Sequence, residues 1–272
     1  MTVLLTGATG FVGRQVHKAL VAEGAAVRVV LRTGTEKRLV APAESIVTTH
    51  DLFAEKAPWW AQACAGIDTV VHAAWYAEPG SYLHSPKNQD CLNGTLELAR
   101  GAIAAHVRRF VGIGTCFEYD VAAGLLTTRT RLDPQTPYAA AKASAFRALS
   151  ELLPARGVSF AWCRLFNLHG EGEDERRLVP YLRRRLLRGE PAELTSGTQV
   201  RDFLDVAQAG RMIAGVALGT QHGPVNVCSG VPVTVRELAE RICDECGGRR
   251  HLLQFGARPD NAFDPPRVVG VR

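Results

Sequence analysis

Short apolar runs alternate, over the first two thirds of the chain, with longer stretches in which apolar residues recur every three or four positions. Such runs are typical of strands buried on both faces of a parallel sheet, and the longer spacing is typical of helices packed on it. Strands that alternate with helices form βαβ units, so the sequence predicts an α/β fold with a doubly wound parallel sheet. The predicted strands are 3–6, 27–31, 45–48, 69–73, 109–113 and 159–164, and the predicted helices are 11–23, 56–65, 88–106 and 137–156.

The alternation becomes less regular after residue 170. Residues 171–200 combine a basic helical pattern with a turn-rich stretch, and residues 202–218 return to a strand followed by a helix. Residues 224–272 give a short strand, a helix over 234–246 and a proline-rich end. This change of pattern predicts a second, smaller unit near the C-terminus.

The sharpest local signal is a glycine-rich turn, Thr-Gly-Ala-Thr-Gly-Phe-Val-Gly, at residues 6–13. Glycines at this spacing permit a tight turn, a close approach of the main chain to a pyrophosphate, and close packing of the next helix on its strand. The free N–H groups and the dipole of a helix N-terminus favour a bound phosphate. The turn therefore predicts a dinucleotide cradle in a Rossmann domain. Its residues are Gly7, Thr9, Gly10, Phe11, Val12 and Gly13.

Composition limits the class of protein. With 272 residues, 46% of them hydrophobic, the chain can bury a full core. No stretch approaches the roughly 20 apolar residues of a membrane helix, and the N-terminus lacks the pattern of a signal peptide. We therefore expect a cytoplasmic protein without a membrane partner. The seven cysteines lie mostly among apolar residues and complete no set of metal ligands, so we expect no metal.

The formal net charge of +5 reflects an arginine-rich chain. Six arginines lie between residues 176 and 188, interleaved with leucine and valine. A solvated helix face explains most of them, and the alternative is that one or two hold a phosphate-bearing ligand. No recognition motif or aromatic-interleaved basic surface accompanies the charge, so we expect no nucleic-acid binding.

Tyr138 and Lys142 lie four residues apart in a strongly helical stretch, which places them on one face, one turn apart. A phenol with a pKa near 10 is a poor acid or base at neutral pH, but a neighbouring ammonium stabilises the phenolate and lowers that pKa. Such pairs also occur on ordinary surface helices. Beyond the fifth predicted strand of a chain with a dinucleotide cradle, the pair predicts acid–base chemistry.

Together these motifs resemble the extended short-chain dehydrogenase/reductase family, which includes nucleotide-sugar epimerases, dehydratases and ketoreductases. The resemblance covers essentially the whole chain and is closest to nucleotide-sugar 4-ketoreductases. It implies a nucleotide-diphosphate sugar as substrate and, because relatives are commonly dimers, a homodimer. The segments that carry it are residues 6–13, 51–52, 70–74 and 93–95, the pair Tyr138 and Lys142, and residues 201–206.

The resemblance also implies roles for single residues. Thr115 would hydrogen-bond the reacting oxygen, Tyr138 would donate the proton, and Lys142 would bind the nicotinamide ribose. The other implied cofactor contacts are Asp51 and Leu52 at the adenine and Ala73 and Ala74 beyond the fourth strand. The implied substrate contacts, besides Thr115, are Asn167, Arg177, Leu178 and Arg201.

The end of the second predicted strand bears on the choice of cofactor. A carboxylate at this position selects NAD because it accepts a hydrogen bond from the ribose 2′-OH. Here Leu31 takes the place of the acid, and Arg32 is available for the 2′-phosphate of NADP. We therefore predict NADP(H) as the preferred cofactor, with NAD(H) as the alternative.

The favoured function is an NADPH-dependent reductase of a nucleotide-diphospho-4-keto-6-deoxyhexose. Asp90 and Cys91 stand where some epimerases carry paired asparagines, which disfavours epimerisation. There are two alternatives. One is a 4-epimerase or dehydratase of the same family, and the other is a non-catalytic protein that senses NADP(H). The predicted units are a Rossmann domain over 1–168 with about 201–222, and a C-terminal nucleotide-sugar-binding lobe over 169–200 and 223–272.

Overall fold

The computed structural model describes residues 1–261 and 264–272. The strands are β1 (Thr2–Thr6), β2 (Ala26–Arg32), β3 (Ser45–Thr49), β4 (Thr69–His72), β5 (Arg109–Thr115), β6 (Leu125–Leu126), β7 (Ser159–Leu165), β8 (Asn167–His169), β9 (Ala192–Leu194), β10 (Val200–Asp205), β11 (Gly223–Val227), β12 (Pro232–Thr234), β13 (Leu253–Phe255) and β14 (Arg267–Gly270). The α-helices are α1 (Phe11–Ala22), α2 (Ala57–Ala63), α3 (Lys87–Ala104), α4 (Pro137–Leu152), α5 (Leu178–Leu187), α6 (Val206–Leu218) and α7 (Val235–Glu245), and the short 3-10 helices include η1 (Glu36–Arg38) and η2 (Cys116–Glu118).

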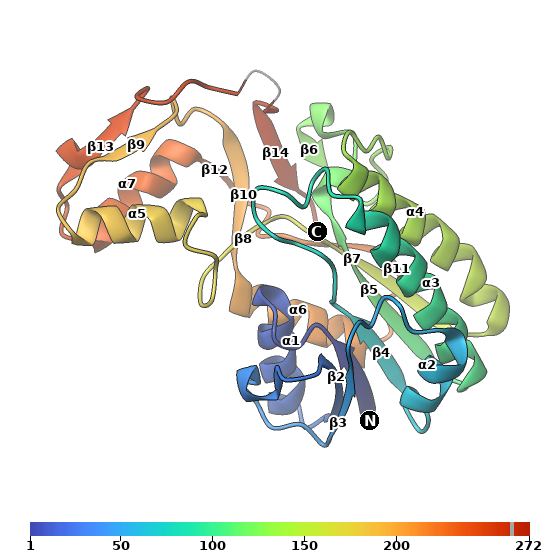
Figure 1. Cartoon of the computed structure of the whole chain (residues 1–272). Helices are drawn as coiled ribbons and strands as arrows, with labels where there is room; N and C mark the ends of the chain where they lie inside the picture. Colours follow the sequence, from blue (N-terminus) through green and yellow to red (C-terminus); the bar gives the residue numbers. More distant parts are fainter. Residues whose placement is uncertain (262–263) are drawn as a thin grey trace.

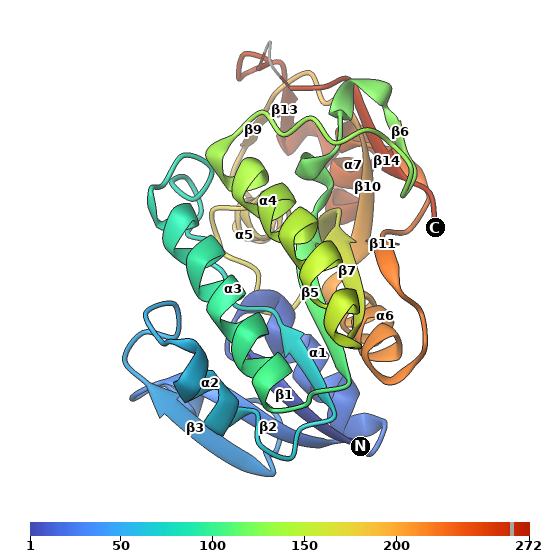
Figure 2. The same ribbon diagram turned by 90° about the vertical axis from the view of Figure 1, so that its right-hand side faces the viewer.

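The larger sheet confirms the predicted doubly wound Rossmann fold. Its seven parallel strands follow the order β3-β2-β1-β4-β5-β7-β11, and all six strands predicted from apolar runs are among them. Helices α1 and α6 pack on one face, and α2, α3 and α4 cover the other (Figures 1 and 2). The strand order reverses between β1 and β4, and ligands bind beyond the carboxyl ends of strands at such a switch point.

A second, smaller part is built mostly from the chain after residue 166, with β6 added from the middle of the chain. A five-stranded sheet has the order β12-β10-β14-β6 with β8 beside β10, and β9 pairs with β13. Helices α5 and α7 pack with β9 and β13 around a core of their own, at a distance from the large sheet in Figure 1. Among the helices that the structure describes, none has the length and apolar composition needed to cross a bilayer.

The structure corrects the predicted division of the chain at two strands. Strand β11 pairs in parallel with β7, so residues 223–227 belong to the Rossmann sheet and not to the lobe. Strand β10 pairs with β8, β12 and β14, so residues 200–205 belong to the smaller sheet, while α6 returns to the large one. An apolar run predicts a strand, but the partner that the strand pairs with depends on distant residues.

Candidate active site

The glycine-rich turn lies between β1 and α1, at the switch point. Gly7 has a φ of 74°, and a Cβ there would lie 2.7 Å from the main-chain nitrogen of Ala74. A Cβ at Gly13 would lie 2.0 Å from the carbonyl oxygen of Gly7. Gly10 is the N-cap of α1, and no side chain caps the helix, which leaves its first N–H groups available to an anion.

A cleft of about 800 Å³ begins at this turn and follows the carboxyl ends of β1, β2 and β4. Phe11 and Val12 do not line it, because their side chains pack against the core of the sheet, and Gly13 supports the turn from behind. The structure brings the other predicted residues of the cofactor site outside the acid–base pair together along its walls. They are Gly7, Thr9, Gly10, Arg32, Asp51, Leu52, Ala73 and Ala74.

One end of the cleft carries positive charge. Leu31 is buried, and Arg32 and Arg38 line the wall beside it. Thr35 donates a hydrogen bond to the carbonyl of Arg32 (Oγ1 to O, 2.7 Å), which closes the turn that leads into η1 and Arg38. Neither guanidinium is paired with a residue in the described part of the chain.

The residues of the predicted acid–base pair do not themselves line the cleft, but Trp75 of the cleft wall lies against them. Thr115 is the last residue of β5, and its side chain acts to lower the pKa of the Tyr138 phenol. Lys142 is buried one turn beyond Tyr138, and its Nζ donates to the carbonyl oxygen of Ile113 at 2.6 Å. Trp75 lines the cleft, and its ring centroid lies 3.8 Å from this Nζ and 6.4 Å from the ring centroid of Tyr138.

The ionisation of this pair differs from the expectation. Burial raises the pKa of Tyr138, and the nearby Tyr82 and Glu118 raise it further, while the hydrogen bond from Thr115 opposes them. Burial lowers the pKa of Lys142 to about 7. The predicted lowering of the Tyr138 pKa by Lys142 is not found, because the ammonium is directed at a main-chain carbonyl and an aromatic ring. Tyr138 is thus a neutral phenol at neutral pH, the form that can donate a proton.

Residues 3–228 match the sequence profile of the NAD dependent epimerase/dehydratase family. The chain belongs to this family. This confirms the resemblance to extended short-chain dehydrogenases/reductases. The chain is 30% identical to dTDP-6-deoxy-L-talose 4-dehydrogenase (NAD(P)(+)) of Kitasatospora kifunensis, over 95% of this chain and 83% of that protein. It is 23% identical to dTDP-6-deoxy-L-talose 4-dehydrogenase (NAD(+)) of Aggregatibacter actinomycetemcomitans, over the full length of both.

Solved structures of epimerase/dehydratase enzymes share the fold. The dTDP-glucose 4,6-dehydratase DesIV of Streptomyces venezuelae, solved with NAD, is 25% identical and superposes with a TM-score of 0.83 over 100% of this chain and 88% of that one. The UDP-glucose 4-epimerase of Thermus thermophilus, solved with NAD, gives a TM-score of 0.82 at 24% identity, over 100% and 90% of the two chains. The Rossmann sheet and its smaller C-terminal part are therefore the architecture of this family.

Two of the predicted substrate residues continue from the acid–base pair toward the smaller part. Thr115 lies opposite Leu165 of β7, and two residues further along the chain Asn167 opens β8, which pairs with β10. Arg201 on β10 is buried, and its Nη2 lies 2.5 Å from Oδ1 of Asp264. The strand pairings thus connect Thr115, Asn167 and the strand that carries Arg201.

The other two predicted substrate residues lie on α5, and neither lines the cleft. Arg177 is the N-cap residue of α5, and its Nε lies 3.8 Å from Oε1 of Glu173. Leu178 packs partly against the core formed by α5 and α7. A substrate would contact these two residues only by reaching from the cleft to the N-terminus of α5.

Sequence analysis missed several residues at the site. Arg38 belongs to a charged turn that has no helical or strand pattern, and Tyr82 lies in a loop, with its ring centroid 4.9 Å from that of Tyr138. Glu118 is fully buried, three residues after Thr115. A carboxylate directly after a buried strand was the one sequence signal for Glu118, since burial of such a group requires partners.

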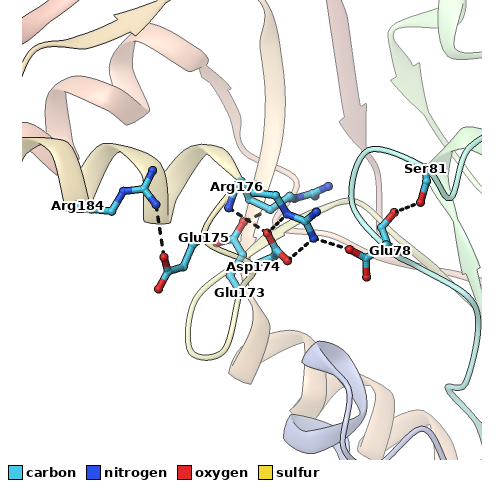
Figure 3. Close-up of polar contacts among 8 residues, drawn as sticks. Glu78, Ser81, Glu173, Asp174, Glu175, Arg176 and Arg184 are labelled. Atoms are coloured by element: carbon cyan, nitrogen blue, oxygen red, sulfur yellow. Dashed lines mark hydrogen bonds and ion pairs between the residues drawn. The ribbon is translucent and has the colours of Figure 1, made fainter.

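Segment 170–177 connects α1 to one wall of the cleft. At one end, Glu171 accepts a hydrogen bond from Lys18 of α1 (Nζ to Oε2, 2.9 Å). At the other end, Arg176 lies between Asp174 and Glu78, as Figure 3 shows, with its Nη2 2.7 Å from Oε1 of Glu78. Glu78 lines the cleft, so this ion pair joins the segment to the cleft wall.

We expect Arg176→Gln to raise the dissociation rate of a bound dinucleotide by about two- to fivefold, because it removes an exposed ion pair across the cleft mouth. Stopped-flow displacement of the dinucleotide measures the rate. Arg184→Gln is the matched control, since Arg184 pairs with Glu175 on the same stretch and contacts no cleft residue in Figure 3. Equal rates for the two variants would show that the Arg176–Glu78 pair does not retain the ligand.

Proposed function

We propose that this protein is an NADPH-dependent reductase of a nucleotide-diphospho-4-keto-6-deoxyhexose. The observation that carries the proposal is Tyr138, a neutral phenol beside Thr115 and against Trp75 of the cleft wall. A phenol in this state can give a proton to a ketone oxygen, as reduction of a ketone requires. The two relatives named as 6-deoxy-L-talose 4-dehydrogenases support the substrate class, because dehydrogenation at C4 is the reverse of reducing a 4-ketosugar.

The residues of the cleft fit a dinucleotide. Gly7 and Gly13 allow main-chain contacts that a Cβ would prevent and that hold the turn tightly at the cleft, and the first N–H groups of α1 have no side-chain cap. Arg32 and Arg38 supply unpaired guanidinium groups for a ribose phosphate, which favours NADPH over NADH. Bound there, NADPH would supply the hydride for the sugar carbon.

The chain's own residues would handle the proton and the charge. Tyr138 donates its proton to the C4 oxygen, and Thr115 stabilises the same oxygen by a hydrogen bond as negative charge develops. Lys142, which donates to the Ile113 carbonyl in this structure, would bind the nicotinamide ribose when the cofactor is present. Asn167, Arg177, Leu178 and Arg201 would hold the nucleotide diphosphate, so that binding energy remote from C4 positions the reacting carbon.

The alternatives differ in chemistry. A 4,6-dehydratase needs a second acid and base for the loss of water, but Cys116 beside Thr115 is a poor candidate because burial raises its pKa to about 12. An epimerase oxidises and re-reduces one sugar and consumes no cofactor. A non-catalytic protein that senses NADP(H) has no need of Thr115, Tyr138 and Lys142 together.

The proposal is tested by supplying a dTDP-4-keto-6-deoxyhexose with excess NADPH and following the absorbance of the reduced cofactor. We expect NADPH to be consumed in equal amount to the ketosugar, with formation of a dTDP-6-deoxyhexose. Interconversion of dTDP- or UDP-hexose 4-epimers without net loss of NADPH would instead identify an epimerase. Cofactor binding without turnover of any of these sugars would support the sensing alternative.

A further inference from the structure

The carboxylate of Glu118 lies directly behind the catalytic hydroxyl. It is fully buried, and its Oε1 accepts hydrogen bonds from the main-chain N–H of Thr115 (2.8 Å) and from Nε1 of Trp162 (2.9 Å). Its Oε2 accepts a hydrogen bond from Nε of Arg164 at 2.7 Å. The Thr115 hydroxyl accepts in return from the main chain of η2, so that the two side chains form a capping box.

Strand β5 leaves space for this arrangement. A Cβ at Gly114 would lie 2.4 Å from Oε1 of Glu118 and 2.2 Å from Nε1 of Trp162. A Cβ at Gly112 would lie 2.3 Å from the Trp162 ring. Glycine inside a strand weakens it and often marks a close approach of another group. The two glycines therefore weaken the central strand β5, but they leave room for the Trp162 ring and the Glu118 carboxylate.

Stability alone does not explain the ion pair between Glu118 and Arg164. Both side chains are almost completely buried, at 0% and 1% exposed. The desolvation of such a pair commonly cancels its attraction, and an apolar pair of similar volume is often as stable. In addition, Nη2 of Arg164 is buried without a hydrogen-bond partner. The role of the negative charge on Glu118 must therefore be sought in its effect on neighbouring groups.

Trp162 connects this charge to Lys142, because its Nε1 donates to Glu118 and its ring centroid lies 5.9 Å from Nζ of Lys142. Burial lowers the pKa of Lys142, whereas Glu118 raises it. The other titratable groups against Lys142 are neutral: burial lowers the pKa of His72 to about 3 and raises that of Cys91 to about 11, and Tyr138 is a neutral phenol. Glu118 is thus the one anion among these groups of the described chain.

The arginine that pairs with Glu118 is held by contacts of its own. The Arg164 guanidinium sits 4.5 Å from the centroids of the Tyr119 and Phe146 rings, and its Nη1 donates to the Tyr119 hydroxyl at 2.9 Å. The Tyr119 hydroxyl donates in turn to Asn226. These contacts hold the Arg164 guanidinium, and through it the Glu118 carboxylate, in place.

We propose that Glu118 is a positioning residue of the active site: it fixes the Thr115 main chain so that the Thr115 hydroxyl meets Tyr138, and its negative charge acts on Lys142 across the Trp162 ring. The proposal rests on the roles of Thr115 and Lys142 in the proposed function. It predicts two separable effects of removing the charge, one on the ionisation of Lys142 and one on the rate.

The test compares Glu118→Gln with Tyr119→Phe, which disturbs the same network at its far end without removing a charge. The chain has only five lysines, so ¹³Cε-lysine NMR resolves Lys142, and Lys142→Met assigns its signal. In Glu118→Gln we expect Lys142 to titrate about one pH unit lower than in the wild type. The pH at which NADPH affinity declines should fall with it, and the single-turnover rate should drop roughly ten- to a hundredfold.

Tyr119→Phe should lower the melting temperature but leave the Lys142 titration in place. If Glu118→Gln does not fold, the double variant Glu118→Gln/Arg164→Met removes the unpaired arginine and is titrated instead. An unchanged Lys142 titration, or an equal shift in Tyr119→Phe, would overturn the proposal. Titration and cofactor binding need no sugar, so a wrong substrate assignment would leave this result intact.

Discussion

Replacing Tyr138 by phenylalanine is expected to lower the single-turnover rate of ketosugar reduction by roughly 10² to 10⁴ while leaving NADPH affinity nearly unchanged. The ring would still pack edge-on against Tyr82 and Trp75, so the shape of the pocket is retained. The transferable proton would be lost. Rapid mixing of the enzyme–NADPH complex with the ketosugar measures the rate, and fluorescence titration measures the affinity.

Two further variants separate the loss of the Tyr138 proton from other changes in the site. Lys142→Ala should weaken both the rate and NADPH binding, because the ammonium serves the ribose as well as the proton donor. Tyr76→Phe removes another phenol of the cleft, one that is hydrogen-bonded to Ser81 at 3.0 Å, and should leave the rate unchanged. A wild-type rate in Tyr138→Phe would refute the assigned proton donor.

The largest expected effect on cofactor choice comes from the two unpaired arginines of the cleft. Arg32→Ala should lower NADPH affinity roughly ten- to a hundredfold, because each charge-assisted hydrogen bond to a phosphate contributes about 1.5–3 kcal/mol. Arg32→Ala/Arg38→Ala should lower it by about a further tenfold. NADH has no 2′-phosphate, so its affinity should change little in either variant. Calorimetric titration with both cofactors measures the ratio.

Removing positive charge anywhere weakens the binding of an anion to some extent. Arg129→Ala controls for this, since Arg129 is exposed in a turn and does not line the cleft. It should reduce the affinities for NADPH and NADH equally and slightly. If Arg32→Ala lowers the affinities for NADPH and NADH by the same large factor, Arg32 contacts a part that the two cofactors share. The basis for a preference for NADPH would then be removed.

The sequence was sufficient where the structure depends on local pattern. Buried parallel strands read as continuous apolar runs, and a glycine that must adopt positive φ or touch another main chain, such as Gly7, leaves a recognisable spacing. The large sheet and the first turn of the cleft were predictable for that reason. The short strands β8, β9 and β12 were not, because three residues carry too little pattern and depend on partners far along the chain.

The ionisation of the site was less predictable than its residues. The spacing of Tyr138 and Lys142 predicted that they share a helix face, but it could not give the direction of the Lys142 side chain. That direction depends on the Ile113 carbonyl and the Trp75 ring, which come from a strand and a loop distant in sequence. The effect of Glu118 could not be predicted for the same reason, since its carboxylate is held by Trp162 and Arg164 of a later strand.

The ion pair between Arg201 and Asp264 changes the thermodynamics expected at the substrate end. A diphosphate that reaches Arg201 does not meet a bare cation, because the guanidinium already holds a carboxylate of its own chain. A diphosphate that binds Arg201 would replace the carboxylate of Asp264. Its binding would therefore release fewer counterions, and depend less on ionic strength, than binding to an unpaired arginine. Under the proposed function the built-in carboxylate would act as an internal competitor, which a weakly binding monovalent ion would not displace and a multiply charged diphosphate would.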